Sequence, residues 1–312
     1  MKICALAAIL AGCSGAPSVL GPTAVPGVHH GPQGSWVSPA AKQAKQLLYV
    51  SRLGTFEVDI FRYNSTTMVG KLTNLNYPYG LCSDRKGDVW ITEFNGFEVV
   101  EYAHGGTTPL KTLATGGRPI GCSVDAKSGD LAVADFSTTS GSGDIEIFKN
   151  ASGQPAKYTS SNFNYLYPPG YDNQGNIFVE GRANSGATGL TELRKGGTTL
   201  VPVSLKGGIF SPAGVMWDGK YVAAADQEYH AQPFTSIYRL KVSDYKATIV
   251  SFTVLTDPYH IVQIVQPWIQ GDEVAGASSN GHVCIWEYPR GGDPRWTIKG
   301  ITGDGVTVST AR

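Results

Sequence analysis

A strand–turn–strand unit recurs along this chain and limits the folds available to it more than any other feature. Its clearest copy is YPYGLCSDRKGDVWITEF at residues 77–94, where an apolar run, a turn rich in Asp and Gly, and a β-branched and aromatic run follow one another. The turn glycines of five copies recur every 42 to 52 residues, at Gly87, Gly129, Gly175, Gly219 and Gly271. Strand repeats with a period of about 40–50 residues predict a β-propeller.

The two ends of the repeated region predict how the ring closes. The run LLYVS at residues 47–51 matches the second strand of the unit, so the chain enters its first blade one strand late. The missing inner strand is matched by GVTVS at residues 305–309, just before the C-terminus. We therefore expect an all-β, six-bladed β-propeller of four-stranded blades over residues 46–312. Its C-terminal strand is expected to pair into the N-terminal blade, which leaves no long sheet edge exposed.

The repeated unit, written Pro-x-Gly-x-x-x-Asp-x-x-Gly-Asp-Val, resembles the NHL-type repeat and is similar to the repeats of streptogramin-lyase-like propellers. The resemblance covers roughly residues 46–312 and implies the same architecture. It carries over no activity, because propellers host both enzymes and binding scaffolds.

The first 45 residues differ in composition from the repeated region. Lys2 followed by the apolar run Ile3–Leu10 is typical of an export signal, which we expect over residues 1–12. The residues Leu-Ala-Gly-Cys that end at position 13 resemble the lipobox of bacterial lipoproteins, which implies that Cys13 is lipidated. Residues 13–45 are rich in Gly and Pro and are expected to form a flexible tether. These features predict an exported protein of the cell envelope, anchored to a membrane by lipid.

Overall charge argues against some partners. Charged residues make up 16% of the chain, with 25 acidic and 25 basic side chains, so we expect no nucleic-acid partner. No run of 18 apolar residues is present, so membrane contact is expected only through the lipid anchor. The protein is also expected to be a monomer. The sequence has no nucleophile elbow, phosphate-binding glycine loop, Cys-x-x-Cys pair or calcium loop, and we predict no cofactor.

Loops that follow the second strands are expected to face one mouth of the ring. Their polar side chains are mostly acidic, with two arginines among them, although a carboxylate at such a position can instead cap its own turn. Loops on a rigid scaffold commonly carry binding groups, so we predict that a small polar ligand or a protein binds there. The predicted ligand-binding residues are Arg52, Glu93, Asp135, Glu180, Arg182, Asp226 and Glu228. Aromatic residues expected on the same loops are Tyr79, Phe94, Phe136, Tyr229 and Tyr259.

Three histidines give an alternative hypothesis for function. His230, His260 and His282 are expected on this same face, and with an acid such as Glu228 they can form a zinc site. Because some NHL-type lyases and hydrolases hold a catalytic metal with histidines at the channel mouth, the alternative function is a metal-dependent lyase or hydrolase. His282 alternatively begins a third strand, and loop histidines are mostly not ligands. We therefore assign no metal residues and expect a binding or scaffold module.

The cysteines of the repeated region leave two alternatives. Cys82 and Cys122 fall on the inner strands of neighbouring blades, one register step apart. In an exported protein they can form a disulfide; alternatively they are buried thiols, because stacked inner strands are often too far apart to be bridged. Cys284 is expected to be a buried side chain on a third strand.

Overall fold

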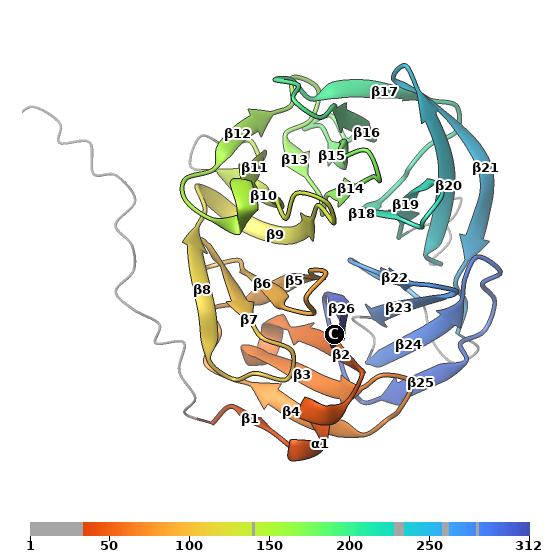
Figure 1. Ribbon diagram of the computed structural model, residues 1–312. Coiled ribbons are helices and arrows are strands. Elements are labelled where there is room, and N and C mark those ends of the chain that lie inside the picture. The colour runs from red at the N-terminus through yellow and green to blue at the C-terminus, as the bar shows by residue number, and fades with distance from the viewer. Residues whose placement is uncertain (1–33, 139–140, 228–233, 258–261, 279–280) are drawn as a thin grey trace, which may run out of the picture.

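The computed structural model describes residues 34–138, 141–227, 234–257, 262–278 and 281–312. In these residues the chain is an all-β, propeller-like ring of sheets around a central axis (Figure 1). The helices of the described part are short: α1 (Pro39–Gln43) and the 3-10 helices η1 (Leu53–Thr55) and η2 (Lys149–Ala151). No helix in these ranges is long and apolar enough to cross a membrane.

Three sheets of the ring have four strands each, ordered from the centre outward. The first contains β5 (Pro78–Ser83), β6 (Val89–Glu93), β7 (Glu98–Tyr102) and β8 (Pro109–Ala114). The second contains β9 (Gly117–Val124), β10 (Leu131–Thr138), β11 (Asp144–Phe148) and β12 (Ala156–Thr159). The third contains β22 (Trp268–Gln270), β23 (Glu273–Ser278), β24 (His282–Glu287) and β25 (Trp296–Lys299).

The N-terminal sheet contains the C-terminal strand of the chain, as the sequence predicted. Its order is β26-β2-β3-β4-β1, with bounds β26 (Val306–Thr310), β2 (Gln46–Arg52), β3 (Glu57–Arg62), β4 (Met68–Leu72) and β1 (Trp36–Val37). Strands β26 and β2 are antiparallel, with Leu48 opposite Val308. In addition, the Ser51 hydroxyl accepts a hydrogen bond from the Gly305 amide at 2.9 Å. The two ends of the repeated region therefore share one sheet, next to the ring centre (Figure 1).

The remaining strands form one nine-stranded sheet, whereas we expected separate four-stranded blades. Its members are β13 (Tyr165–Leu166), β14 (Gly170–Tyr171), β15 (Ile177–Arg182), β16 (Thr188–Leu193), β17 (Val201–Leu205), β18 (Pro212–Trp217), β19 (Val222–Asp226), β20 (Ser236–Ser243) and β21 (Lys246–Val254). Strands β17 and β21 join its two parts through a short parallel pairing in which Ser204 lies opposite Lys246 and Leu205 opposite Ala247. Eight residue pairs hold the β20–β21 hairpin together, and its outer strand β21 lies beside β17, the outer strand of the neighbouring part.

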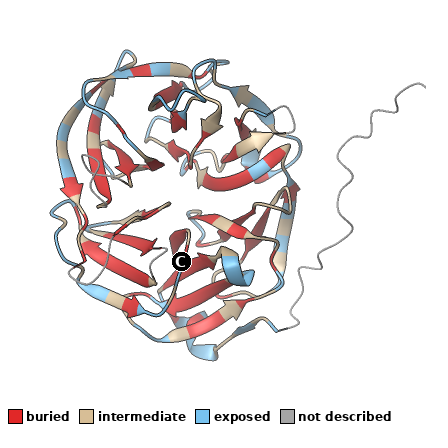
Figure 2. Cartoon of the chain, turned by 180° about the vertical axis from the view of Figure 1, so that it is seen from behind, coloured by how far each residue is buried: buried red, intermediate tan, exposed pale blue. Residues whose placement is uncertain are grey.

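How far a residue is buried depends on the position of its strand within the sheet. All five residues of β6 and all five of β19 are buried, because neighbouring sheets cover both faces of these second strands. The outer strands β8, β12 and β21 carry mostly half-buried and exposed residues. Figure 2 shows the same gradient, with buried residues on the inner strands and exposed ones at the rim.

The turns between inner and second strands have the predicted chemistry. In the first copy the Asp84 carboxylate accepts hydrogen bonds from the amides of Lys86 at 2.8 Å and Asp88 at 2.9 Å. The five turn glycines all have positive φ, between 64° and 91°, a conformation that residues with a Cβ rarely adopt. These short-range features explain why the repeat is visible in the sequence.

Inner strands approach one another closely at the centre of the ring. A Cβ on Gly80 would lie 2.2 Å from the Ile120 carbonyl oxygen and 2.6 Å from the Gly121 Cα, so only glycine fits there. This approach places the Cα atoms of Cys82 and Cys122 at 5.6 Å, and the two residues form a disulfide between β5 and β9. Of the two alternatives for these cysteines, the structure has the disulfide.

The last part of the predicted tether packs on the ring. Trp36 and Val37 pair with β4, and Ser38 caps α1 by accepting a hydrogen bond from the Ala41 amide. The Ala41 side chain is completely buried in the core of the N-terminal sheet. Part of residues 34–45 therefore forms β1 and α1 on the ring, in a stretch where the sequence predicted a flexible tether. The predicted signal peptide and Cys13 lie outside the described residues.

Candidate functional site

The acidic residues predicted to bind a ligand are buried and do not give the ring a charged, open mouth. Glu93, Asp135, Glu180 and Asp226 lie at or near the ends of second strands as expected, but the exposed fraction of each is 0%. Arg182 is exposed at the end of β15, and Arg52 is half-buried beside Asp59 and Glu57. Glu228 lies outside the described residues. The pattern predicted the position of these side chains but not that the acids point inward.

Three of the buried acids accept hydrogen bonds from backbone amides in an inner strand or just before one. The Glu180 carboxylate accepts hydrogen bonds from the amides of Ala213 at 2.9 Å and Gly214 at 2.8 Å, which links β15 to β18. Asp226 accepts from the amides of Phe210 and Ser211, before β18, and Glu93 accepts from the amide of Asn76, before β5. Burial raises the pKa of Glu180 well above its ordinary value, although the two amide bonds oppose the shift. These contacts give the acids a structural role.

Asp135 belongs to a separate cluster of buried acids. Its carboxylate, those of Asp144 and Glu146, and the Lys157 ammonium lie together between β10, β11 and β12, with Glu146 and Lys157 at 2.5 Å. Burial and the negative charges of Glu146 and Asp144 raise the pKa of Asp135 to about 9. Burial and the negative charge of Glu146 raise the pKa of Asp144 to about 6. Asp135 therefore carries a proton at neutral pH, and the cluster holds less charge than its composition suggests.

The described aromatic residues of the predicted face pack on one another. The rings of Tyr79 and Phe94 are 5.9 Å apart, and the Arg118 guanidinium lies 5.1 Å from the Phe94 ring centre. Phe136 stacks on Tyr165 at 4.8 Å. Tyr229 and Tyr259 lie outside the described residues.

A cavity of about 360 Å³ lies inside the ring, walled by the inner strands β9, β14, β18 and β22. Its size is within the range of small-molecule sites. Half-buried apolar and aromatic side chains line it, including Tyr171, Met216, Trp217 and Trp268. Asp125, Lys127 and Asp172, on turns between inner and second strands, supply charged groups at its rim. Trp217 and Trp268 were not among the predicted site residues, although their place at the end of β18 and the start of β22 was the available signal.

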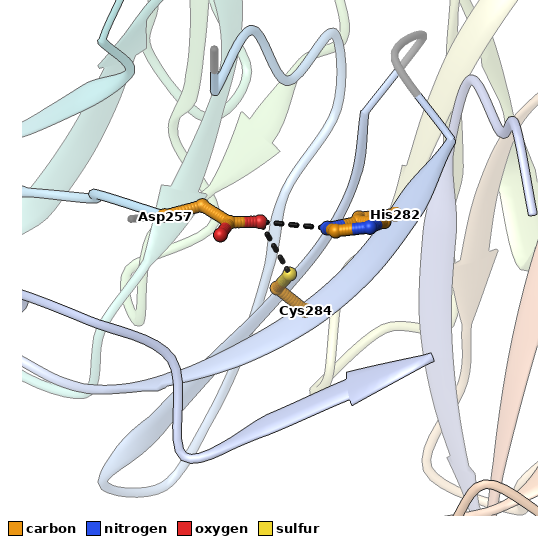
Figure 3. A group of neighbouring side chains, drawn as sticks. All are labelled: Asp257, His282 and Cys284. Carbon is orange, nitrogen blue, oxygen red and sulfur yellow. Dashed lines mark hydrogen bonds and ion pairs between the residues drawn. The ribbon is translucent and has the colours of Figure 1, made fainter. Parts of the chain in front are cut away.

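The histidines of the alternative hypothesis are only partly described. His230 and His260 lie outside the described residues, and His282 is the first residue of β24, the third strand of its sheet. Its Nδ1 lies 2.7 Å from Oδ2 of Asp257, and the Cys284 sulfur lies 3.9 Å from the same oxygen (Figure 3). All three side chains are buried. Burial raises the pKa of the Cys284 thiol to about 12, so this cysteine is not an activated nucleophile.

Comparisons with known proteins identify the fold. No protein-family model matches the chain, and no curated protein matches it. A solved nidogen/laminin complex has a TM-score of 0.66 and 15% identity, over 86% of this chain and 99% of that one. A protein of unknown function from Bacteroides caccae has a TM-score of 0.62 and 14% identity, over 85% and 99% of the two chains. The β-propeller domain of Cps50 (Swd1) from Myceliophteria thermophila has a TM-score of 0.56 and 12% identity, over 86% and 87%. At these identities the likeness shows a β-propeller fold.

Proposed function

We propose that this protein is a binding module whose small-molecule ligand occupies the central cavity. The observation that carries the proposal is the combination of size and lining: about 360 Å³, with Tyr171, Trp217 and Trp268 half-buried in its wall. Aromatic side chains offer flat apolar surface to a planar or sugar ring. The exposed ammonium group of Lys127 at the rim then orients a polar edge of the ligand.

The cavity supports this function better than the ring of acids does. Glu93, Glu180 and Asp226 already accept hydrogen bonds from backbone amides, so a ligand would have to displace structural contacts to reach them. The walls of the cavity, in contrast, present side chains that are only half-buried. A site on the loop face stays a prediction for Arg182, which is exposed.

A panel of small aromatic and sugar compounds, screened by saturation-transfer NMR, tests where a ligand binds. Met216→Trp fills the cavity and should abolish the signals of compounds that bind the wild-type protein. Arg182→Gln alters the opposite loop face and is the matched control, which should keep these signals. Compounds that still bind Met216→Trp but no longer bind Arg182→Gln would place the site on the loop face and overturn the proposal.

We further infer that the ring has six blades of the NHL type. Both parts of the nine-stranded sheet run from an inner strand to an outer strand in the same order as the separate sheets. Two residue pairs between β17 and β21 join these parts, which is little compared with the eight pairs within the β20–β21 hairpin. The sheet is therefore best described as two blades in contact at their rims.

Membrane tethering of this module is a proposal from the sequence around Cys13. The disulfide between Cys82 and Cys122 supports it, since such bonds persist in oxidising compartments outside the cytoplasm. The full-length protein should enter the detergent phase with membranes, and Cys13→Ser should release it. Equal membrane association of both forms would contradict lipidation. Retention would also require more than one acyl chain, because a single chain binds only marginally.

A further inference from the structure

We propose that Asp257, His282 and Cys284 form a binding site for a divalent transition metal, with zinc as the best match. The candidate ligand atoms of the three side chains all lie within 4.8 Å of one another. Figure 3 shows the Asp257 carboxylate directed at the imidazole of His282 and the sulfur of Cys284. The cluster is separate from the central cavity, so the proposal does not depend on the proposed ligand.

The donor set has the chemistry that zinc prefers. Thiolate sulfur, imidazole nitrogen and carboxylate oxygen are its usual protein ligands, whereas calcium and magnesium prefer oxygen alone. A Cys284 thiolate and an Asp257 carboxylate together carry two negative charges, which neutralise a divalent cation. This balance matters because the three residues are 2–8% exposed, and a buried charge without compensation is costly.

The distances fit an ion if the Asp257–His282 contact widens and the Asp257–Cys284 contact shortens slightly. Oδ2 of Asp257 lies 2.7 Å from Nδ1 of His282 and 3.9 Å from Sγ of Cys284. Ligand atoms around a tetrahedral zinc are about 3.3–3.7 Å apart, as metal–ligand bonds of about 2.0–2.3 Å require. Binding releases the Cys284 thiol proton to solvent, and an unprotonated ring nitrogen of His282 faces the ion. The three residues then occupy three of the four positions that zinc prefers.

The backbone holds the three residues in place. His282 and Cys284 are two residues apart on β24, which lies between β23 and β25, so both side chains project from one face of a paired strand. The segment before Asp257 is fixed by hydrogen bonds from the Leu255 amide to Thr235 and from the Thr256 amide to Gly292, both 2.9 Å. The Trp286 indole also donates to the Thr256 carbonyl at 2.8 Å. Such a rigid frame lowers the cost of assembling a metal site.

The same geometry argues against a cysteine protease-like arrangement. In such a dyad the imidazole accepts the thiol proton, and the acid orients the imidazole from its other nitrogen. Here the Cys284 sulfur and the His282 Nδ1 both contact the same oxygen of Asp257. The acid therefore lies between the other two side chains, an arrangement in which all three can bind one metal ion. The Thr297 hydroxyl lies 3.6 Å from the sulfur.

Cobalt and zinc binding to the full chain test the site. After treatment with EDTA, addition of cobalt(II) alone should give a thiolate-to-cobalt charge-transfer band and tetrahedral d–d bands, and zinc should bind with a stoichiometry of one per chain at this site. Cys284→Ala should abolish the charge-transfer band, whereas the double variant Cys82→Ala and Cys122→Ala, which lacks the two disulfide cysteines but retains Cys284, should keep it. His282→Gln should weaken zinc binding by at least about 100-fold, because even outer partners of metal ligands are worth about 10–100-fold.

His104 is the control for the histidine, because it bonds Ser309 and the Ala44 carbonyl, away from this cluster. His104→Gln should bind zinc like the wild type. Absence of a thiolate–cobalt band in the wild-type chain would overturn the proposal without reference to any variant. Equal zinc affinity of His282→Gln and His104→Gln would overturn it as well.

Discussion

Two boundaries between neighbouring repeats of the ring are held by different chemistry. Between β5 and β9 the link is covalent, through Cys82 and Cys122, and β5 is also tied to β26 by the Ser83 hydroxyl, which donates to the Val308 carbonyl at 2.8 Å. Between β15 and β18 the link is the buried Glu180 carboxylate and its two amide donors. A disulfide restricts the conformations of the unfolded chain, whereas the carboxylate accepts its hydrogen bonds only in the folded state. The first boundary should therefore respond to redox conditions and the second to pH.

The largest effect is expected at the first boundary, from removal of residues 303–312. This deletion removes β26, which pairs with β2 over Gln46–Val50, and exposes the unpaired edge of β2. We expect loss of cooperative unfolding, or aggregation. Deletion of residues 14–33 is the control and should leave the melting temperature nearly unchanged. A shortened chain that melts like its parent would show that β26 does not close the ring.

Removal of the disulfide should have the next largest effect. Cys82→Ala combined with Cys122→Ala should lower the free energy of unfolding by about 2–4 kcal/mol, because the bond closes a long loop in the unfolded chain. The two cysteines are 40 residues apart. Chemical denaturation with and without reductant measures the effect. Reductant should destabilise the wild-type protein and leave the double variant unchanged. A loss of similar size in the variant on addition of reductant would assign the effect to another disulfide.

The smallest effect is expected at the second boundary and depends on pH. Because burial raises the pKa of Glu180, the folded state keeps a proton that the unfolded chain releases at lower pH. The associated stabilisation is complete below the ordinary pKa of a glutamate and is lost as pH rises through the folded-state value. Glu180→Gln keeps an oxygen acceptor without a charge, so its stability should decline less with rising pH.

Glu180→Ala is the matched comparison. It leaves the amides of Ala213 and Gly214 without their acceptor, which should cost about 1–3 kcal/mol. Melting temperatures of the three proteins across a pH series check both statements. Parallel pH profiles for the wild type and Glu180→Gln would show that this carboxyl does not set the pH response of the boundary.

Much of the fold could be predicted because its signals are local. The turn glycines and the aspartate before each turn act within a few residues, and the strand at residues 305–309 resembles the other inner strands. The β17–β21 pairing could not be predicted, since it depends on how far the β20–β21 hairpin reaches. The packing of residues 34–45 was missed because it depends on the surface of β4, far along the chain from Trp36.

The candidate site was predicted less well, for a related reason. Sequence placed the acids at the ends of second strands, but the direction of a carboxylate depends on which backbone amides lie beside it in the folded ring. Glu180 finds its donors 33 and 34 residues away. Likewise, Asp257 lies 25 residues before His282, and no compact ligand motif marks the pair. The disulfide required the close approach at Gly80, which only the assembled inner strands reveal.

The pairing of β26 with β2 determines when this protein can finish folding. Gln46 and Thr310 are 264 residues apart, so β2 emerges early in synthesis and receives its inner neighbour only after β26 has been made. Contacts of such long range form slowly. During this interval the edge of β2 is available to other chains, and a newly made molecule at high local concentration is exposed to mispairing. A chain released before β26 has been made therefore leaves the edge of β2 uncovered by its own strands.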